Sequence, residues 1–325
     1  MIVLKEADQM IPILYLVIPC YNEEEVLPET ASRLGVKLRN LIEDNKVSGN
    51  SRICFVNDGS KDNTWGIIRS LHEDDKIYSG INLSRNRGHQ NALLSGLMTV
   101  KDLCDVTISM DADLQDDIEA VDAMLEKYAE GNDIVYGVRS DRGTDTSFKR
   151  NTALSYYRLL SRLGIESVYN HADYRLMSRR ALDGLAEFKE VNLFLRGMVP
   201  LVGFPYATVE YARGERFAGE SKYPFHKMLA FAIEGITSLS VKPIRFITTL
   251  GIAIFIAAVI FAIVFIVQYF MSMTVTGWAS TIVSIWALGG LQLFAIGIIG
   301  EYIGKIYLET KARPRFIVQD FINEE

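Results

Sequence analysis

The sequence contains few cysteines and histidines, and both types are scattered. Its three cysteines, Cys20, Cys54 and Cys104, lie in or beside apolar runs, and its four histidines stand far apart. Neither type shows the short spacing of a zinc site. We therefore expect three reduced cysteines in the protein core and no metal centre built from histidine.

An excess of basic residues is also missing. The formal net charge is −6 at pH 7, which argues against a nucleic-acid partner. The first apolar stretch, Met10 to Cys20, follows Glu6 and Asp8 rather than basic residues and carries no small-residue cleavage site. This stretch therefore predicts a first strand and not a secretion signal.

Charge is absent from one long segment near the C-terminus. Phe246 through Gly300 contains no Asp, Glu, Lys, Arg or His. A helix needs about 20 apolar residues to cross a bilayer, so the segment is long enough for two spans. We predict them at Phe246–Phe270 and Thr281–Gly300, joined by the turn Ser272–Gly277. A buried helical hairpin in a soluble protein is the alternative.

Cations lie on both outer sides of the predicted spans, whereas the connecting turn has none. They are Lys242, Arg245, Lys305, Lys311, Arg313 and Arg315. By the positive-inside rule, both ends of the hairpin and the whole preceding chain are expected in the cytoplasm. This predicts a protein of the inner or plasma membrane with two spans.

The preceding residues alternate between apolar runs and helical patterns. The spacing predicts βαβ units, an α/β class and a mostly parallel, Rossmann-like sheet. The predicted strands are Ile13–Ile18, Arg52–Val56, Ile77–Leu83, Val106–Met110 and Asp133–Val138.

An acidic turn follows the fourth predicted strand. Asp111 and Asp113 flank Ala112 at the carboxyl end of this strand, the edge where open α/β sheets bind ligands. Two such carboxylates suit Mg²⁺ or Mn²⁺, completed by water and substrate phosphates. They could also be turn residues. Asp116 could be a helix N-cap, with Glu119 as its capping-box partner.

Other strand ends carry candidate binding residues. Pro19 and Tyr21 would shape a pocket, and Arg139 would border the same cavity. Glu23 could accept a hydrogen bond from a ribose hydroxyl. Asp58 could accept one from the N–H of a uracil or guanine. Alternatively, Glu23 could only stabilise the start of the following helix, where a negative charge complements the helix dipole.

Three later segments allow two interpretations each. The loop Ser84–Asn91, with two arginines, either binds an anion or is a surface loop. Asp173 beside Arg175 is either functional or a surface ion pair. The apolar segment Val191–Phe204 is expected on the membrane surface rather than in a core.

A glycine-hinged loop, Tyr211 to Tyr223, precedes the predicted spans. Its Arg216 and Lys222 could meet phosphates of a substrate. Anionic lipid could instead hold the same cations.

These motifs occur in an order that resembles one family. Pro19-Cys20-Tyr21-Asn22-Glu23, Val56 to Ser60, Asp111 to Asp116 and Arg216 to Tyr223, followed by two spans, resemble the family 2 glycosyltransferases that load a sugar onto a polyprenyl phosphate. Within this family, the sequence is most similar to bactoprenol glucosyltransferases and dolichol-phosphate mannose synthases. The resemblance covers nearly the whole chain, and the paired spans favour the bacterial glucosyl type. Relatives often have two prolines where this chain has Asp117-Ile118.

The resemblance implies a GT-A fold, an inverting reaction and a metal-bound nucleotide diphosphate. Asp113 would be the principal metal ligand, and Asp111 would reach metal or ribose. The other residues that it implicates are Pro19, Tyr21, Glu23 and Asp58 for the nucleoside, Gln115 and Arg139 beside the sugar, Arg216 and Lys222 over the phosphates, and Asp173 beside the acceptor. Ala112, between the two aspartates, belongs to the same set of binding residues.

The expected function is transfer of glucose from UDP-glucose to undecaprenyl phosphate, with GDP-mannose and UDP-N-acetylhexosamines as further donors to consider. A decayed, membrane-anchored nucleotide-sugar-binding protein is the rival, and a small transporter subunit is another. We expect a homo-oligomer. The predicted division is a cytoplasmic GT-A domain at 1–210, a juxtamembrane loop and amphipathic helix at 211–243, two transmembrane helices at 244–304 and a cytoplasmic tail at 305–325.

Overall fold

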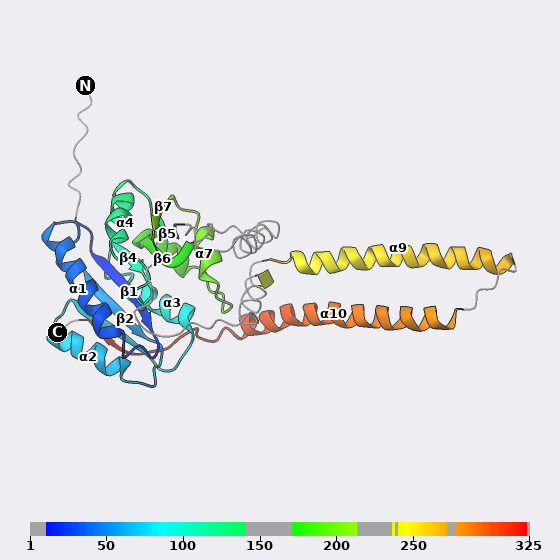
Figure 1. Cartoon of the computed structure of the whole chain (residues 1–325), viewed down its shortest axis with the longest axis horizontal. Helices are drawn as coiled ribbons and strands as arrows, with labels where there is room; N and C mark the ends of the chain where they lie inside the picture. The colour runs from blue at the N-terminus through cyan, green and yellow to red at the C-terminus, as the bar shows by residue number, and fades with distance from the viewer. Residues whose placement is uncertain (1–10, 141–170, 213–235, 238–239, 272–276, 324–325) are drawn as a thin grey trace, which may run out of the picture. The chain divides into compact units, whose positions relative to one another are not determined.

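The computed structural model describes residues 11–140, 171–212, 236–237, 240–271 and 277–323 (Figure 1). These residues belong to two compact units. The first contains residues 11–140, 171–212 and 314–323, and the second contains 236–237, 240–271 and 277–313. The chain thus leaves the first unit before the apolar segment and returns to it afterwards.

The first unit is built on an eight-stranded mixed sheet of order β7-β5-β6-β4-β1-β2-β3-β8. Neighbours pair in parallel at β1/β2, β1/β4, β2/β3 and β5/β7, and antiparallel at β3/β8, β4/β6 and β5/β6. The predicted α/β class and mostly parallel sheet are confirmed, whereas β6, β7 and β8 were not predicted. The strands are β1 (Leu14–Cys20), β2 (Arg52–Asn57), β3 (Tyr78–Leu83), β4 (Val106–Ser109), β5 (Ile134–Arg139), β6 (His171–Ser178), β7 (Tyr206–Tyr211) and β8 (Val318–Ile322).

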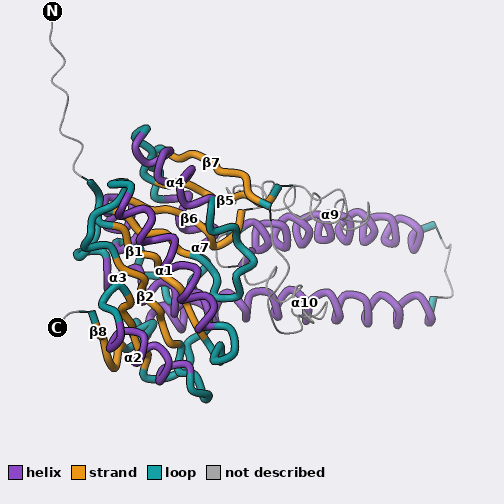
Figure 2. The backbone as a smooth tube through the Cα atoms, turned by 60° about the vertical axis from the view of Figure 1, so that its left-hand side comes forward, coloured by secondary structure: helices purple, strands orange, loops and turns teal. Residues whose placement is uncertain are grey.

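Helices cover both faces of this sheet (Figure 2). Along β1, Leu16 and Ile18 face one apolar core and Tyr15 and Val17 face the other, as the strand period of two requires. The cysteines are free and buried, as predicted. The first core contains α1 (Leu27–Glu43), α2 (Thr64–Asp74) and α4 (Ala120–Ala129), and the second contains α3 (His89–Val100), α6 (Arg179–Ala186) and α7 (Leu195–Leu201).

The apolar segment Val191–Phe204 belongs to the second core. Leu195, Met198 and Val199 are almost fully buried there against residues of α3 and α6. The prediction that this segment lies on the membrane surface is therefore wrong. Its composition fits either site, and only the tertiary packing distinguishes them.

The C-terminal residues complete the sheet. Strand β8 pairs antiparallel with β3, so that Asn82 lies opposite Asp320 and its Nδ2 donates to the carboxylate at 2.9 Å. The backbone of Ser84 donates to the carbonyl of Ile317 at 3.0 Å. This part of the predicted tail is therefore an integral strand of the first unit.

The second unit consists mainly of two long helices that lie side by side, α9 (Lys242–Phe270) and α10 (Trp278–Lys311) (Figure 1). Both are long and apolar enough to cross a membrane, over Lys242–Phe261 and Ser284–Lys311. Large apolar side chains such as those of Phe246 and Trp286 are exposed on them, unlike those of a core hairpin. Helix α10 extends beyond the predicted end at Gly300 to Lys311.

Candidate active site

The acidic turn projects from the carboxyl end of β4, as predicted. The side chains of Asp111 and Asp113 are partly exposed rather than packed away. Asp113 also stabilises the turn, because its Oδ1 accepts from the backbone of Gln115 at 3.2 Å. Leu114, between Asp113 and Gln115, has a φ of 56°, a left-handed conformation that costs free energy in a branched residue. The turn is therefore held in a strained shape, which is a common property of ligand sites.

The carboxylates of this turn favour a cation. Burial raises the pKa of Asp111 to about 6; the positive charge of His89 works against this rise, while Asp116, Asp173 and Asp113 add to it. A divalent ion would favour the ionised form of such a carboxylate. Among the described residues no group of three or more His, Cys, Asp or Glu could hold a metal ion. Asp111 and Asp113 provide only two carboxylates, so an Mg²⁺ or Mn²⁺ held there would need further ligands from phosphates and water, and their role as metal ligands stays a prediction.

Asp116 has a different role from the predicted N-cap. Helix α4 begins after Glu119, and its first turn has no side-chain cap. The buried Asp116 instead accepts from the hydroxyl of Tyr211 at 2.5 Å, and Arg139 Nη2 lies 3.8 Å from the same oxygen. Arg139 Nε also donates to the Tyr211 hydroxyl at 3.3 Å. The ends of β5 and β7 are thus tied to the acidic turn, and Arg139 is brought beside it.

Asp173 lies in β6, next to β4 in the sheet, within a cluster of cationic groups. Arg175 Nη2 donates to Oδ1 at 2.5 Å, and Arg196 Nη2 donates to Oδ2 at 3.1 Å. The Arg175 side chain is 1% exposed, so this is no surface ion pair. Burial raises the pKa of Asp173, but His89, Arg175 and Arg196 outweigh it and hold the pKa well below its usual range.

His89 joins the two acidic groups and was missed from the sequence. Its Nε2 lies 3.6 Å from Asp111 Oδ1 and 3.6 Å from Asp173 Oδ2. It is the first residue of α3, after Gly88, whose φ of 83° favours glycine. The sequence signal was only a histidine next to a glycine at a helix start, which is too common to indicate a site.

The predicted nucleoside side of the site lies at the ends of β1 and β2. Asp58 is buried, and its two oxygens accept from the backbone amides of Arg87 at 2.6 Å and Gly88 at 2.9 Å. Each carboxylate oxygen can accept a second bond, so its contact with a nucleobase stays a prediction. Pro19 lies in β1, and Tyr21, just beyond this strand, is 41% exposed. Glu23 lines a groove of about 470 Å³ together with Lys61 and Asp62.

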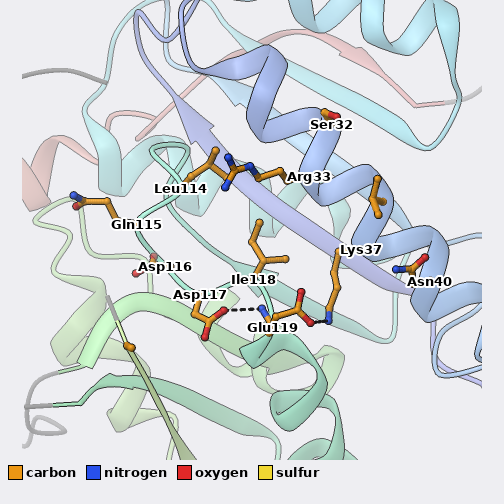
Figure 3. A pocket seen from close by; sticks show the side chains of 12 residues that line it. Ser32, Arg33, Lys37, Asn40, Leu114, Gln115, Asp116, Asp117, Ile118 and Glu119 are labelled. Carbon is orange, nitrogen blue, oxygen red and sulfur yellow. Dashed lines mark hydrogen bonds and ion pairs between the residues drawn. The ribbon is translucent and has the colours of Figure 1, made fainter. Parts of the chain in front are cut away.

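A second groove, of about 550 Å³, lies between α1 and residues 114–119 (Figure 3). Lys37 of α1 pairs there with Glu119 at 2.5 Å and also with Asp122. Gln115 and Asp116 lie at its rim. The ion pairs of Lys37 join α1 to the start of α4, which explains the charges of Lys37 and Glu119 in this groove without a ligand.

Two predicted phosphate-binding residues, Arg216 and Lys222, lie outside the described residues, as does most of the segment 211–243. The structure brings Asp111, Asp113, Asp173 and Arg139 together, with Ala112 buried beneath the turn and Gln115 at its end. Their role in binding a cation and anionic substrates stays a prediction.

The mixed sheet, with an acidic turn at the carboxyl edge of its parallel strands, agrees with the predicted GT-A fold, and the family match identifies the class as a glycosyltransferase. The family model of Glycosyl transferase family 2 matches residues 15–185, and the chain belongs to this family. The predicted family is confirmed.

The chain is 52% identical to the uncharacterized glycosyltransferase YkoT of Bacillus subtilis, over 97% of this chain and 94% of that protein. It is 41% identical to the bactoprenol glucosyl transferase of Shigella phage SfX, over 94% of this chain and 98% of that protein. Among solved structures, mannosyl-3-phosphoglycerate synthase from Rubrobacter xylanophilus is similar at a TM-score of 0.48 and 14% identity, over 70% of this chain and 73% of that one.

Proposed function

We propose that this enzyme transfers glucose, with inversion, from UDP-glucose to a polyprenyl phosphate such as undecaprenyl phosphate. The relatives named bactoprenol glucosyl transferase, which align over nearly the whole chain, carry this proposal. The paired carboxylates of Asp111 and Asp113 support a donor bound through a divalent cation. Transfer of mannose from GDP-mannose is the alternative within the same chemistry.

The two apolar helices support a location at the membrane. A polyprenyl tail stays in the hydrocarbon, so an enzyme tethered there meets its acceptor without the full entropic cost of encounter. The chain enters and leaves α9 and α10 from one compact unit, which accords with two crossings and with the proposed cytoplasmic position of both ends.

The donor side of the reaction requires stabilisation of the departing nucleotide. Asp111 and Asp113 would hold Mg²⁺ or Mn²⁺ against the diphosphate, where the ion would neutralise negative charge on the leaving group. Arg139 lies beside this turn and is proposed to border the sugar, together with Gln115. Arg216 and Lys222 are proposed to close over the phosphates and to add positive charge there.

The acceptor side needs no strong base. A phosphate monoester has a second pKa near 6, so its attacking oxygen is mostly anionic at neutral pH. Asp173 is a weak base, because three cationic groups hold its pKa low. We infer that it positions the acceptor, with Arg196, rather than removing a proton.

Asp173→Asn is therefore expected to keep turnover within about tenfold of the wild type, a barrier change near 1.4 kcal/mol. A depressed folded-state pKa means that Asp173 stays ionised above its unfolded value near 4 and loses its charge only as the pH falls below that. The pH–rate profiles of both proteins should then have the same shape between about pH 6 and 9. Loss in the variant of an acid limb, in which the wild-type rate falls as the pH is lowered, would instead assign proton removal to Asp173.

The proposal is tested with the purified full chain in detergent or vesicles. Undecaprenyl phosphate is incubated with labelled UDP-glucose, GDP-mannose or UDP-N-acetylhexosamines, with and without EDTA. We expect a glucosyl lipid from UDP-glucose alone, loss of product with EDTA, and recovery with Mg²⁺ or Mn²⁺. The anomeric coupling constant of the product reports inversion. Metal-dependent nucleotide binding without any product would favour the decayed binding protein.

A further inference from the structure

His89 contacts the two acidic groups that the proposed reaction assigns to different substrates. Asp111 belongs to the turn for the metal-bound donor, and Asp173 lies on the acceptor side. The imidazole Nε2 is 3.6 Å from a carboxylate oxygen of each. Because His89 comes from a third element, α3, it connects the donor and acceptor sides without being part of either.

Hydrogen bonds hold the chain on both sides of His89. Asp58 binds the amides of Arg87 and Gly88 immediately before it. Gln90 immediately after it accepts from the backbone of Leu195 at 2.8 Å, at the start of the helix that carries Arg196. The start of α3 is thus anchored to the residue that follows β2 and to the start of α7, so the backbone of His89 holds its imidazole within reach of both carboxylates.

The partners of the two carboxylates differ in number. Asp173 is also bound by Arg175 and Arg196. Asp111, by contrast, forms an ion pair only with His89 within the part of the chain that the structure describes. A donor complex that engages Asp111 therefore competes with His89 alone, and the imidazole is left with Asp173 as its carboxylate partner.

We propose that His89 is a positioning residue that couples donor binding to acceptor binding. With the nucleotide and its cation at Asp111, the imidazole bonds only to Asp173 and fixes that carboxylate, with Arg196 beside it, for the acceptor phosphate. The acceptor then binds more tightly to the donor complex than to the free enzyme. This inference rests on the proposed function.

The test measures binding rather than turnover. Farnesyl phosphate, a short polyprenyl phosphate, is titrated into the detergent-solubilised full chain with and without UDP and Mn²⁺. In the wild type we expect at least about fivefold tighter binding in the presence of UDP and Mn²⁺, the lower end of usual coupling energies. His89→Ala should reduce this ratio to about one, while its affinity for UDP and Mn²⁺ does not fall, because the donor no longer competes with His89 for Asp111. His89→Gln, which keeps an N–H donor, should recover most of the ratio.

Asn91→Ala is the matched control. Asn91 lies one residue beyond Gln90 at the start of α3, and its Nδ2 donates to the carbonyl of Arg87 at 2.9 Å. The variant therefore loses a helix-start hydrogen bond but leaves both carboxylate contacts of His89 intact, and it should keep the wild-type ratio.

A wild-type ratio in His89→Ala would overturn the inference and leave the proposed function intact. An equal loss of UDP–Mn²⁺ affinity in that variant would also overturn it, because His89 would then only support the fold of the site. If the wild type binds UDP with Mn²⁺ but never binds farnesyl phosphate, the proposed acceptor is wrong and the inference fails with it.

Discussion

Asp113→Ala is expected to lower kcat/KM by about 10³-fold or more, because it removes a carboxylate that would hold the cation against the donor diphosphate. The substitution should also abolish Mn²⁺-dependent binding of UDP, which isothermal titration calorimetry measures without turnover. Asp113 Oδ1 accepts from the backbone of Gln115, so some loss of local order accompanies the loss of a ligand.

Asp117→Asn is the matched control for this prediction. Asp117 belongs to the same loop, and its Oδ1 accepts from the backbone of Glu119 at 3.0 Å, a bond that asparagine can keep. Its kcat/KM and UDP affinity should remain within about threefold of the wild type, as for a substitution at a partly exposed position that keeps its hydrogen bond. Retention of metal-dependent UDP binding by Asp113→Ala would contradict the assignment of the acidic turn.

Removal of residues 314–325 is expected to cause the largest loss of stability. It deletes β8, leaves the edge of β3 unpaired, and removes Phe316 and Val318 from the second core. It also removes the carbonyl of Pro314, to which Arg87 donates at 3.3 Å. We expect the midpoint of thermal unfolding to fall by at least about 10 °C, or the protein to aggregate on purification.

A point variant tests the contacts of β8 without shortening the chain. Asp320→Ala leaves Asn82 Nδ2 without its carboxylate and should cost about 1 kcal/mol, a shift of about 2–4 °C in a domain of this size. Gln319→Ala on the same strand is the control and should stay within about 1 °C. Equal melting temperatures for the truncated and intact chains would refute the structural role of β8.

The sequence predicted the strands whose residues are apolar on both faces. β1 to β5 were found within one or two residues at most boundaries, because a run buried between two helix layers is hydrophobic throughout. β6 was missed because Asp173 and Arg175 interrupt its apolar pattern. An ion pair buried within a strand breaks the apolar pattern from which strands are predicted, so such a strand is missed from the sequence.

Site residues that lie close together in the chain could be predicted from the sequence. Those that meet only through tertiary contacts could not. Asp111 and Asp113 are separated by one residue in the chain and follow a clear strand. His89 and Arg196 meet Asp173 only because α3, α7 and β6 converge. Tyr211 was likewise noticed only as the beginning of a loop, although its hydroxyl binds Asp116.

The position of β8 also has a consequence for biosynthesis. Because β8 follows α10 in the chain, the ribosome must produce both long apolar helices before the sheet can receive its last strand. Until then β3 presents an open edge, which is prone to pairing with other chains. The nascent protein therefore acquires its finished sheet only after both long apolar helices have been made.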